Sequence, residues 1–487
     1  MRDAGERSAG ILLHPTSLPG PHGIGELGPE ALSFVRFLEE AGQRLWQTLP
    51  LGPTGASGSP YSSYSAFAGN PLLVSTDLLA EDGLIEAAAP EGPDSSVDYP
   101  AVMALKGKRL REAFGWSQPG REIEKFREEH RPWLEDYTLY AALKERFDGA
   151  PWTAWDRDLA RREPGALARA RRELVDEVRF HEWVQYRFFR DWGRVKGTAN
   201  RAGIEVMGDL PIFVAHDSAD VWANQELFFL DGDGEPSVVA GVPPDYFSET
   251  GQLWGNPLYR WERMAEDGYA WWVGRMRMSL TLFDAVRVDH FRGFEAYWEV
   301  PAGDETAANG HWVDGPKDAL FEALRGALGE LSIIAEDLGD ITPEVEALRD
   351  RLGLPGMKIL QFAWGSGPDN PYLPHNYGHG NWISYTGTHD NDTTAGWLAS
   401  ASTEELSYLR RYTGREFAGV EDVVRLAYSS VAARAVVPMQ DVLGLGSEAR
   451  INTPGIAQGN WTWRMEGSSL TPELAAWLAD MTEVYGR

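Results

Sequence analysis

The sequence contains no cysteine among its 487 residues. Disulfide bonds, thiolate zinc sites and cysteine nucleophiles are therefore excluded, and so is a small disulfide-stapled fold. Positive charge is also scarce, because 45 Lys and Arg residues face 73 Asp and Glu residues and leave a formal net charge of −28. A field of that sign repels phosphate backbones and anionic lipid surfaces, so neither nucleic acid nor a membrane is an expected partner.

Long hydrophobic runs are missing as well. The first apolar run, residues 11–13, is far shorter than a secretory h-region or a membrane span, and the residues before it carry both charge signs. A cytoplasmic protein is expected on these grounds. No motif for a metal or a bound cofactor stands out, and nothing in the sequence calls for an obligatory protein partner.

Short apolar runs rich in β-branched residues recur along the chain, and several are followed by helical patterns. One such pattern covers residues 31–41, and Thr342-Pro343, Ser402 with Glu405, and Thr471-Pro472 mark the starts of later helices. The candidate buried strands are residues 10–13, 45–49, 204–207, 285–288, 331–335, 357–362, 382–385 and 435–439. Strand and helix alternating about eight times predicts the α/β class, as a (β/α)8 TIM barrel.

The strands are unevenly spaced, which predicts large insertions between barrel strands that form subdomains around the active-site cleft. An aromatic stripe of Phe180, Trp183, Tyr186 and Phe189 in the first insertion is interpreted as core packing. The second insertion is rich in Pro and Gly, so its aromatic residues are expected on a loop. The predicted segments are residues 1–50 (barrel start), 51–203 (largely helical insertion), 204–215 (third strand), 216–274 (insertion with an active-site loop) and 275–487 (remaining barrel and last helix).

Acidic residues follow four of the predicted strands. Arg287 and Asp289 share one face of the strand at 285–288, and the guanidinium is expected to favour the ionised carboxylate. Asp209, Glu336 and Asp390 follow the strands at 204–207, 331–335 and 382–385. Active sites of such barrels lie at the carboxyl ends of the strands, so these acids outweigh the alternative that each is a structural ion pair.

Clustered carboxylates without a metal motif favour glycosidic chemistry, in which one acid attacks the anomeric carbon and another protonates the leaving oxygen. Metal-dependent phosphoryl chemistry is the competing use of such a cluster, but it requires basic residues that this chain supplies sparingly. The chain also holds 20 Trp, 17 Tyr and 19 Phe residues. Aromatic rings that are not needed for the core offer flat platforms of the kind that sugar rings favour.

A set of longer motifs spans nearly the whole chain. They are Leu13-His14-Pro15-Thr16-Ser17-Leu18-Pro19-Gly20, Ser59-Pro60-Tyr61, Ser65-Ala66-Phe67-Ala68-Gly69-Asn70-Pro71, Gly208-Asp209-Leu210-Pro211-Ile212, Pro243-Pro244-Asp245-Tyr246-Phe247, Gly251-Gln252-Leu253-Trp254-Gly255-Asn256-Pro257, the acid motifs at 285–290, 331–337 and 382–391, and Asn452-Thr453-Pro454-Gly455. Together they resemble amylomaltases, the disproportionating 4-α-glucanotransferases of the α-amylase clan. The resemblance implies an enzyme without cofactors or metals that transfers α-1,4-glucan segments from a donor to the 4-hydroxyl of an acceptor and can close them into rings. Maltooligosaccharides, amylose and other α-1,4-glucans are the substrates it implies.

The same resemblance implies roles for individual residues. Asp289 is similar to the nucleophile, Glu336 to the acid/base and Asp390 to the acid that stabilises the transition state. The substrate-binding residues that it implies are Ser59, Tyr61, Asp209, Tyr246, Phe247, Gln252, Trp254, Arg287, His389 and Asn460, with Tyr246, Phe247, Gln252 and Trp254 on a loop that covers the cleft. Relatives carry an aromatic residue after Gly-Pro-Thr-Gly where this chain has Ala56, so a secondary glucan site that rests on that aromatic is not expected.

Three other functions remain open at this point. An α-amylase-type retaining hydrolase would use the same acids. A glucan-binding module without activity would keep the aromatic residues but would not need an acid after four strands. A nicotinamide-dependent oxidoreductase is suggested only by Gly23-Ile24-Gly25-Glu26-Leu27-Gly28, which matches the dinucleotide fingerprint but lies beyond several prolines from the nearest strand.

Overall fold

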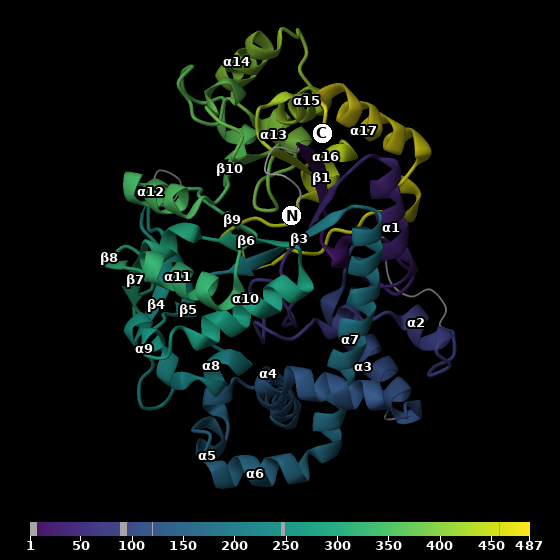
Figure 1. The fold of residues 1–487 in the computed structure, drawn as a ribbon, viewed down its shortest axis with the longest axis vertical. Helices are drawn as coiled ribbons and strands as arrows, with labels where there is room; N and C mark the ends of the chain where they lie inside the picture. The colour runs from purple at the N-terminus through teal and green to yellow at the C-terminus, as the bar shows by residue number, and fades with distance from the viewer. Residues whose placement is uncertain (1–6, 88–94, 119, 245–248, 457) are drawn as a thin grey trace.

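Eight parallel strands form the centre of the molecule. The computed structural model describes residues 7–87, 95–118, 120–244, 249–456 and 458–487. Its largest sheet has the order β10-β11-β12-β1-β2-β3-β6-β9, and the backbone amide of Ala335 in β9 reaches the carbonyl of Pro355, just before β10, at 2.9 Å. The sheet is thus a nearly closed barrel (Figure 1), which confirms the predicted fold class and all eight predicted strands. The strands are β1 (Ser8–Leu12), β2 (Leu45–Gln47), β3 (Glu205–Pro211), β6 (Ala285–Asp289), β9 (Ile333–Ala335), β10 (Gly356–Ile359), β11 (Trp382–Tyr385) and β12 (Arg434–Pro438).

Helices pack around the barrel as an outer layer. α17 contacts α1, α1 contacts α7, and the series continues through α10, α11 and α12, while α15 packs against α17. Residues 360–381, all of which the structure describes, link β10 to β11 with short 3-10 turns and no α-helix, because several Pro and Gly residues interrupt this stretch. The helices of this layer are α1 (Pro29–Glu40), α7 (Val175–Arg201), α10 (Ala270–Leu282), α11 (Lys317–Leu328), α12 (Pro343–Leu352), α13 (Thr394–Ser400), α14 (Thr403–Thr413), α15 (Val420–Ser429), α16 (Met439–Val442) and α17 (Pro472–Tyr485).

The sequence between β2 and β3 forms a helical subdomain at the bottom of Figure 1. Its helices α3, α4 and α6 pack on α7, where Phe180 and Trp183 are buried and Tyr186 and Phe189 are half-buried. The aromatic stripe is therefore core packing, as predicted. The helices are α2 (Thr76–Glu81), α3 (Tyr99–Trp116), α4 (Arg121–Arg146), α5 (Arg157–Ala160) and α6 (Pro164–Glu173).

A four-stranded antiparallel sheet lies beside the barrel, built from the segments that follow β3 and β6. Its order is β5-β4-β7-β8, with β4 (Val238–Val242), β5 (Gln252–Pro257), β7 (Ala296–Pro301) and β8 (His311–Asp314). The short helices α8 (Ala219–Ala223) and α9 (Trp261–Ala265) flank the first two strands in the sequence. The expectation of a loop at 252–257 was wrong, because these residues form edge strand β5. An edge strand has a neighbour on one side only, so it tolerates Pro257, which has no amide hydrogen to donate, and the flexible Gly255.

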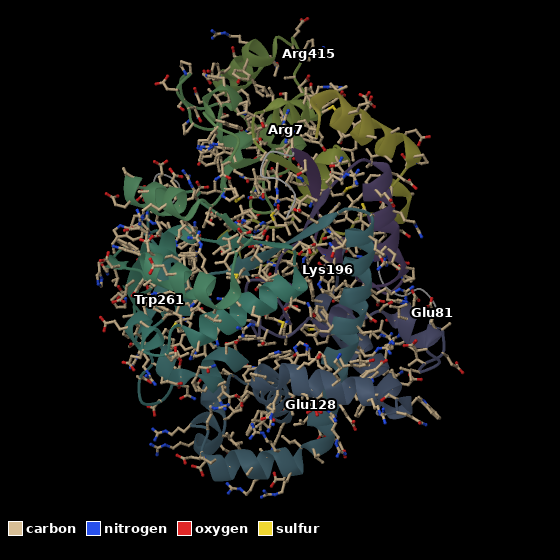
Figure 2. The ribbon with its side chains drawn as sticks, viewed as in Figure 1. Arg7, Glu81, Glu128, Lys196, Trp261 and Arg415 are labelled. Atoms are coloured by element: carbon tan, nitrogen blue, oxygen red, sulfur yellow. The ribbon has the colours of Figure 1, made fainter. Side chains whose placement is uncertain are left out.

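The first and last described residues lie together at one end of the barrel. The guanidinium of Arg7, labelled in Figure 2, donates to the backbone carbonyls of Tyr485, Tyr428 and Ser430. Arg487 reaches the carbonyl of Ser8 at 3.2 Å. These bonds fasten the start of β1 to the end of α17. Among the described residues, no helix combines the length and the apolar character that a membrane crossing requires.

Candidate active site

Three acidic residues reach the same end of the barrel from neighbouring strands. In the strand register, Asp209 of β3 lies opposite Arg287 of β6, and Val288 of β6 lies opposite Ala335 of β9. Asp289 and Glu336 are the residues that follow this second pair. Since the carboxyl ends of parallel strands meet at one rim, the register alone makes the three acids neighbours.

Arg287 lies at the centre of the cluster and is almost fully buried. Its Nη1 donates to both carboxylate oxygens of Asp209, at 2.8 and 2.7 Å, and its Nη2 lies 3.0 Å from Oδ1 of Asp289. Burial disfavours the charged guanidinium, but the two carboxylates outweigh burial and raise the pKa of Arg287. Arg287 therefore remains charged and fixes the positions of both acids.

Asp289 is the acid most open to the cleft within this group, since 27% of its side chain is exposed whereas Asp209 is buried. The predicted contact with Arg287 is present. The expected effect of Arg287 is also confirmed, since the guanidinium lowers the pKa of Asp289. Burial outweighs it and, together with the neighbouring acids Asp209 and Glu336, raises this pKa well above its ordinary value.

Two backbone amides hold the carboxyl group of Glu336. The amide of His290 donates to Oε2 at 2.6 Å and the amide of Leu338 donates to Oε1 at 3.0 Å. His290 has the left-handed conformation, with φ of 52°, which turns its amide towards Glu336 directly after the nucleophile candidate Asp289. Burial raises the pKa of Glu336 to about 7, against the opposing effects of Arg287 and the two amides.

The acids titrate as a pair, and their contacts decide where the charge resides. Asp289 has an ion pair with Arg287, whereas no Lys, Arg or His of the described chain forms an ion pair with Glu336. Burial favours the protonated form of both acids, whereas the ion pair with Arg287 favours the charged form of Asp289. One attacking carboxylate and one proton donor are what cleavage of a glycosidic bond requires.

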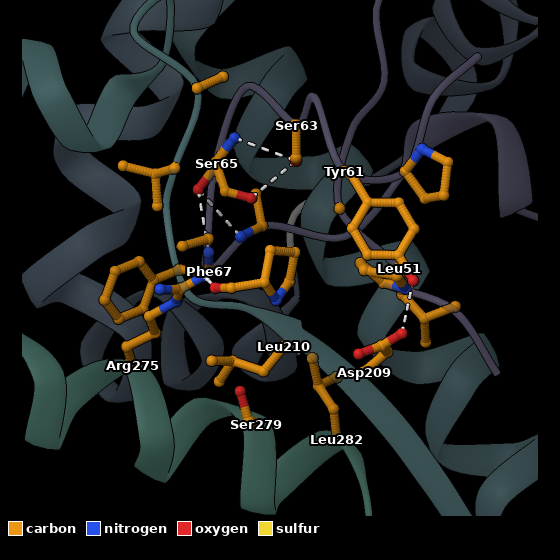
Figure 3. Close-up of a pocket in the computed structure, with 18 of the residues that line it drawn as sticks. Leu51, Tyr61, Ser63, Ser65, Phe67, Asp209, Leu210, Arg275, Ser279 and Leu282 are labelled. Carbon is orange, nitrogen blue, oxygen red and sulfur yellow. Dashed lines mark hydrogen bonds between the residues drawn. The ribbon is translucent and has the colours of Figure 1, made fainter. Parts of the chain in front are cut away.

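Tyr61 and His389 form a second wall of the site. The Tyr61 hydroxyl donates to Oδ2 of Asp209 at 2.6 Å, as Figure 3 shows, and lies 2.9 Å from Nε2 of His389. The Tyr61 and His389 rings are stacked, with centroids 5.3 Å apart and planes 13° apart, and Trp461 packs against both. Burial lowers the pKa of His389, so the neutral imidazole can donate Nε2–H to the Tyr61 oxygen.

Asp390 lies beside His389, whose Nε2 is 3.4 Å from Oδ2 of Asp390, and 43% of the Asp390 side chain is exposed. Nδ2 of Asn452 donates to Oδ1 of Asp390 at 2.6 Å, and the Arg450 guanidinium donates to the Asp390 carbonyl at 2.6 Å. Asn452, Arg450 and Trp461 were given no role by sequence reasoning. The motif that begins at Asn452 was the available signal, but only the fold brings it to Asp390, 62 residues away in the chain.

Asn460 and Ser59 are not brought into contact with the acids. The Asn460 amide is used inside its own segment, where it accepts from the Thr453 amide at 2.9 Å and donates to the carbonyls of Thr453 and Ile456. Ser59 is half-buried two residues before Tyr61, and no hydrogen bond of the described residues joins its side chain to the acid cluster. Direct contact of these two residues with substrate stays a prediction.

Strand β5 brings one exposed aromatic ring to the site. Trp254 is 38% exposed, its Nε1 donates to Oε1 of Gln252 at 3.2 Å, and its ring meets that of His290 edge-on with centroids 4.8 Å apart. Because His290 follows Asp289 directly, Trp254 lies close to the acid cluster. Its contact with substrate stays a prediction. Tyr246 and Phe247 lie outside the described residues.

The arrangement defines a class of protein. A (β/α)8-type barrel presents two carboxyl groups at the carboxyl ends of adjacent strands, one ion-paired with Arg287 and one with a pKa raised to about 7, beside exposed aromatic and hydrogen-bonding side chains. No group of three or more His, Asp or Glu residues in the described segments is arranged to hold a metal ion. The site is that of an enzyme acting on glycosidic bonds.

Comparisons with known proteins identify the family. Residues 13–471 match the model of glycoside hydrolase family 77, described as 4-alpha-glucanotransferase. The chain is 53% identical to the 4-alpha-glucanotransferase of Thermus thermophilus over 99% of both chains, and 51% identical to that of Synechocystis sp., covering 99% of this chain and 98% of the other. The chain therefore belongs to the 4-alpha-glucanotransferase family.

Solved structures agree with this assignment. The amylomaltase from Streptococcus agalactiae in complex with acarbose superimposes with a TM-score of 0.96 and 39% identity, covering 99% of this chain and all of the other. The amylomaltase from Corynebacterium glutamicum shares the fold, with a TM-score of 0.78 and 19% identity, over 99% of this chain and 75% of that one.

Proposed function

We propose that this 4-α-glucanotransferase transfers α-1,4-glucan segments by a retaining double displacement in which Asp289 is the nucleophile and Glu336 the acid/base. The observation that carries the proposal is the pairing of charges: Asp289 is ion-paired with Arg287 at 3.0 Å, and the neighbouring Glu336 has a pKa of about 7. Of two such neighbouring carboxyl groups, the ionised one can attack the anomeric carbon of a glycosidic bond and the protonated one can give its proton to the oxygen of the same bond.

In the first step, Oδ of Asp289 attacks the anomeric carbon of the donor and the bond to the departing 4-oxygen breaks. Glu336 supplies the proton to that oxygen, so the shortened glucan leaves as a neutral alcohol. In the second step, the Glu336 carboxylate takes the proton from the 4-hydroxyl of an acceptor, whose oxygen displaces Asp289. Two inversions at one carbon give retention of the α configuration.

Other residues bind the sugar ring at the point of cleavage. Asp390 is exposed to the cleft and oriented by Asn452, which suits it to accept hydrogen bonds from ring hydroxyls as positive charge develops at the anomeric carbon. Tyr61 and His389 offer a stacked pair of rings with their polar edges joined to Asp209. Asp209 and Arg287 position other groups: Asp209 holds the Tyr61 hydroxyl, and Arg287 holds the Asp289 carboxylate.

The products of maltotriose distinguish this function from hydrolysis. Transfer yields glucose together with maltotetraose, maltopentaose and longer chains, because each segment removed is joined to another acceptor. An α-amylase-type hydrolase yields only shorter sugars. Chromatography of the products at several times measures the difference, and shortening without any elongation would contradict the proposal.

Transfer must exceed attack by water, which requires a surface that retains the acceptor. Trp254 supplies such a surface beside the acids, so Trp254→Ala is expected to weaken acceptor binding by about tenfold, the loss that corresponds to roughly 1.4 kcal/mol of apolar contact. The ratio of hydrolysis to transfer on maltotriose should rise accordingly. Trp116→Ala, which removes a 73% exposed ring at the end of α3, is the matched control and should leave the ratio unchanged. An unchanged ratio in Trp254→Ala would exclude Trp254 from acceptor binding.

We further propose that the natural substrates are α-1,4-glucans and that the protein is cytoplasmic. Amylose and maltooligosaccharides follow from the family and from the glycosidic site, and radiolabelled glucose incorporated into long chains would test the acceptor class. The cytoplasmic location is tested by cell fractionation with an antibody to the chain.

A further inference from the structure

A second cavity lies outside the acid cluster, between α4, α8 and α10. Its volume is about 350 Å³, near the lower end of the roughly 300–1,000 Å³ that is usual for small-ligand sites. Its aromatic lining consists of Phe67, Trp133, Tyr137 and Trp271. The rings of Phe67 and Trp133 lie 15° from parallel with centroids 6.4 Å apart, and Trp271 meets Phe67 edge-on at 6.0 Å. These walls match the flat faces of a sugar ring.

One buried carboxyl belongs to this aromatic wall. Asp220 is only 4% exposed, and its Oδ2 accepts a hydrogen bond from the Ala66 amide at 2.7 Å. Burial raises the pKa of Asp220 to about 6. Within the described segments the hydrogen-bond donors to this carboxyl are the amide of Ala66 and its own amide, and the charge of Arg275 acts on it without a direct ion pair. A ligand with hydroxyl groups would stabilise such a buried carboxyl by donating hydrogen bonds to it.

The lining selects among ligand classes. An anion would be repelled by Asp220. Glu129 and Asp136 also line the cavity, but Glu129 is ion-paired with Lys125 and Asp136 with Arg162 and Arg171, and a cation would further meet the Arg277 side chain in the same lining. A neutral ring with apolar faces and several hydroxyls satisfies both the aromatic walls and the carboxyl, in either protonation state of Asp220. We propose that this cavity binds one or two glucosyl units of an α-glucan at a site separate from the catalytic acids, an inference that rests on the glucan substrate proposed above.

The cavity shares a wall with the active site. Ser65 and Phe67 line this cavity and also line the pocket that contains Tyr61 and Asp209. Figure 3 shows that second pocket, with these four residues labelled. Oγ of Ser65 accepts from the amide of Phe67 at 3.1 Å, which holds this segment in a tight turn. A glucosyl unit in the cavity would therefore contact the same stretch of chain that carries Tyr61.

Gly274 of α10 allows the cavity to be filled selectively. A Cβ atom at Gly274 would lie 3.7 Å from Cε1 of Phe67, an ordinary contact, so Gly274→Ala is tolerated and serves as the control. Gly274→Leu places a branched side chain in the cavity. Both changes are combined with Asp289→Asn to prevent turnover, and maltose binding is measured by titration calorimetry. We expect two classes of site in Asp289→Asn and in the Gly274→Ala combination, and one in the Gly274→Leu combination.

Asp220→Asn provides a second variant of nearly unchanged shape. It should weaken maltose at the second site by about tenfold while the catalytic site is unaffected, because the amide replaces one hydroxyl acceptor by a donor. Crystals of Asp289→Asn soaked in maltose should show a glucosyl ring between Trp133 and Asp220.

Three results would overturn the inference. The first is an equal number of maltose sites in the two Gly274 variants. The second is maltose density in the crystal without a second site in solution, that is, binding at crystal concentration only. The third is binding of tetramethylammonium but not of maltose. Maltotriose disproportionation by the Gly274→Leu protein with Asp289 intact separates the two proposals. Its persistence supports the catalytic assignment whatever the cavity binds, whereas a failure of the unaltered protein to elongate maltotriose would contradict the proposed function itself.

Discussion

Asp289→Asn is expected to reduce glucan transfer by at least about 10⁴-fold, because the amide cannot attack the anomeric carbon and no other acid lies in its place. The change is nearly isosteric, so the ion-pair partner Arg287 keeps its bonds to Asp209 and the fold is retained. The rate of maltotriose disproportionation measures the effect, and circular dichroism checks the fold.

The matched control lies at the other end of the same strand. Asp284 precedes β6, where it pairs with Lys196, labelled in Figure 2, at 2.9 Å and accepts from the Val206 amide at 2.8 Å. Asp284→Asn should lower the stability of the protein and leave the turnover within about twofold of the original. Comparable losses in both variants would show that the effect of Asp289→Asn is structural.

The configuration of a rescued product tests the role of Asp289 more directly. With α-maltotriosyl fluoride as donor and azide as nucleophile, Asp289→Gly should give a β-glycosyl azide, because one displacement inverts the anomeric carbon. An α-azide from this variant would contradict the nucleophile assignment.

Glu336→Gln is expected to reduce transfer from maltotriose by about 10²–10⁴-fold, the usual contribution of a positioned proton donor. The same variant should still release fluoride from α-maltotriosyl fluoride at close to the original rate, since fluoride leaves without a proton. Pre-steady-state fluoride release measures the first step by itself. Equal losses with both donors would exclude Glu336 as the acid.

The pKa of Glu336 also predicts the pH dependence. Burial raises this pKa to about 7, and the first step needs the protonated form, so cleavage of maltotriose should fall tenfold per pH unit once the pH rises above about 7. With α-maltotriosyl fluoride as the donor, this decrease of the rate at high pH should disappear, because fluoride leaves without a proton. Asp337→Asn gives a second test: the charge of Asp337 helps to raise the pKa of Glu336, so this variant should keep the decrease in rate but show it at lower pH. Asp337 is also buried against Arg349 and the Met357 amide, so the variant should lose stability.

Much of the barrel was predictable because its strands are buried on both faces. Runs such as residues 382–385 and 435–439 are largely apolar, and in a chain of alternating strands and helices such short runs indicate strands that are covered on both sides. The strand β5 was not predictable, because it lies at a sheet edge where Pro and Gly are tolerated and the loop-like composition carries no strand signal.

The sequence alone singled out the residues that we propose bear the chemistry. Asp289, Glu336 and Asp390 each follow an apolar strand, and a barrel brings the ends of such strands to one rim whatever the intervening loops do. It could not determine the electrostatics. The raised pKa of Asp289 and the hold of Asn452 on Asp390 come from burial and from contacts between distant segments. Local spacing in the sequence indicates neither the desolvation of a side chain nor its contacts with residues far away in the chain. Only the tertiary structure therefore decided how far the pKa values of these acids are shifted.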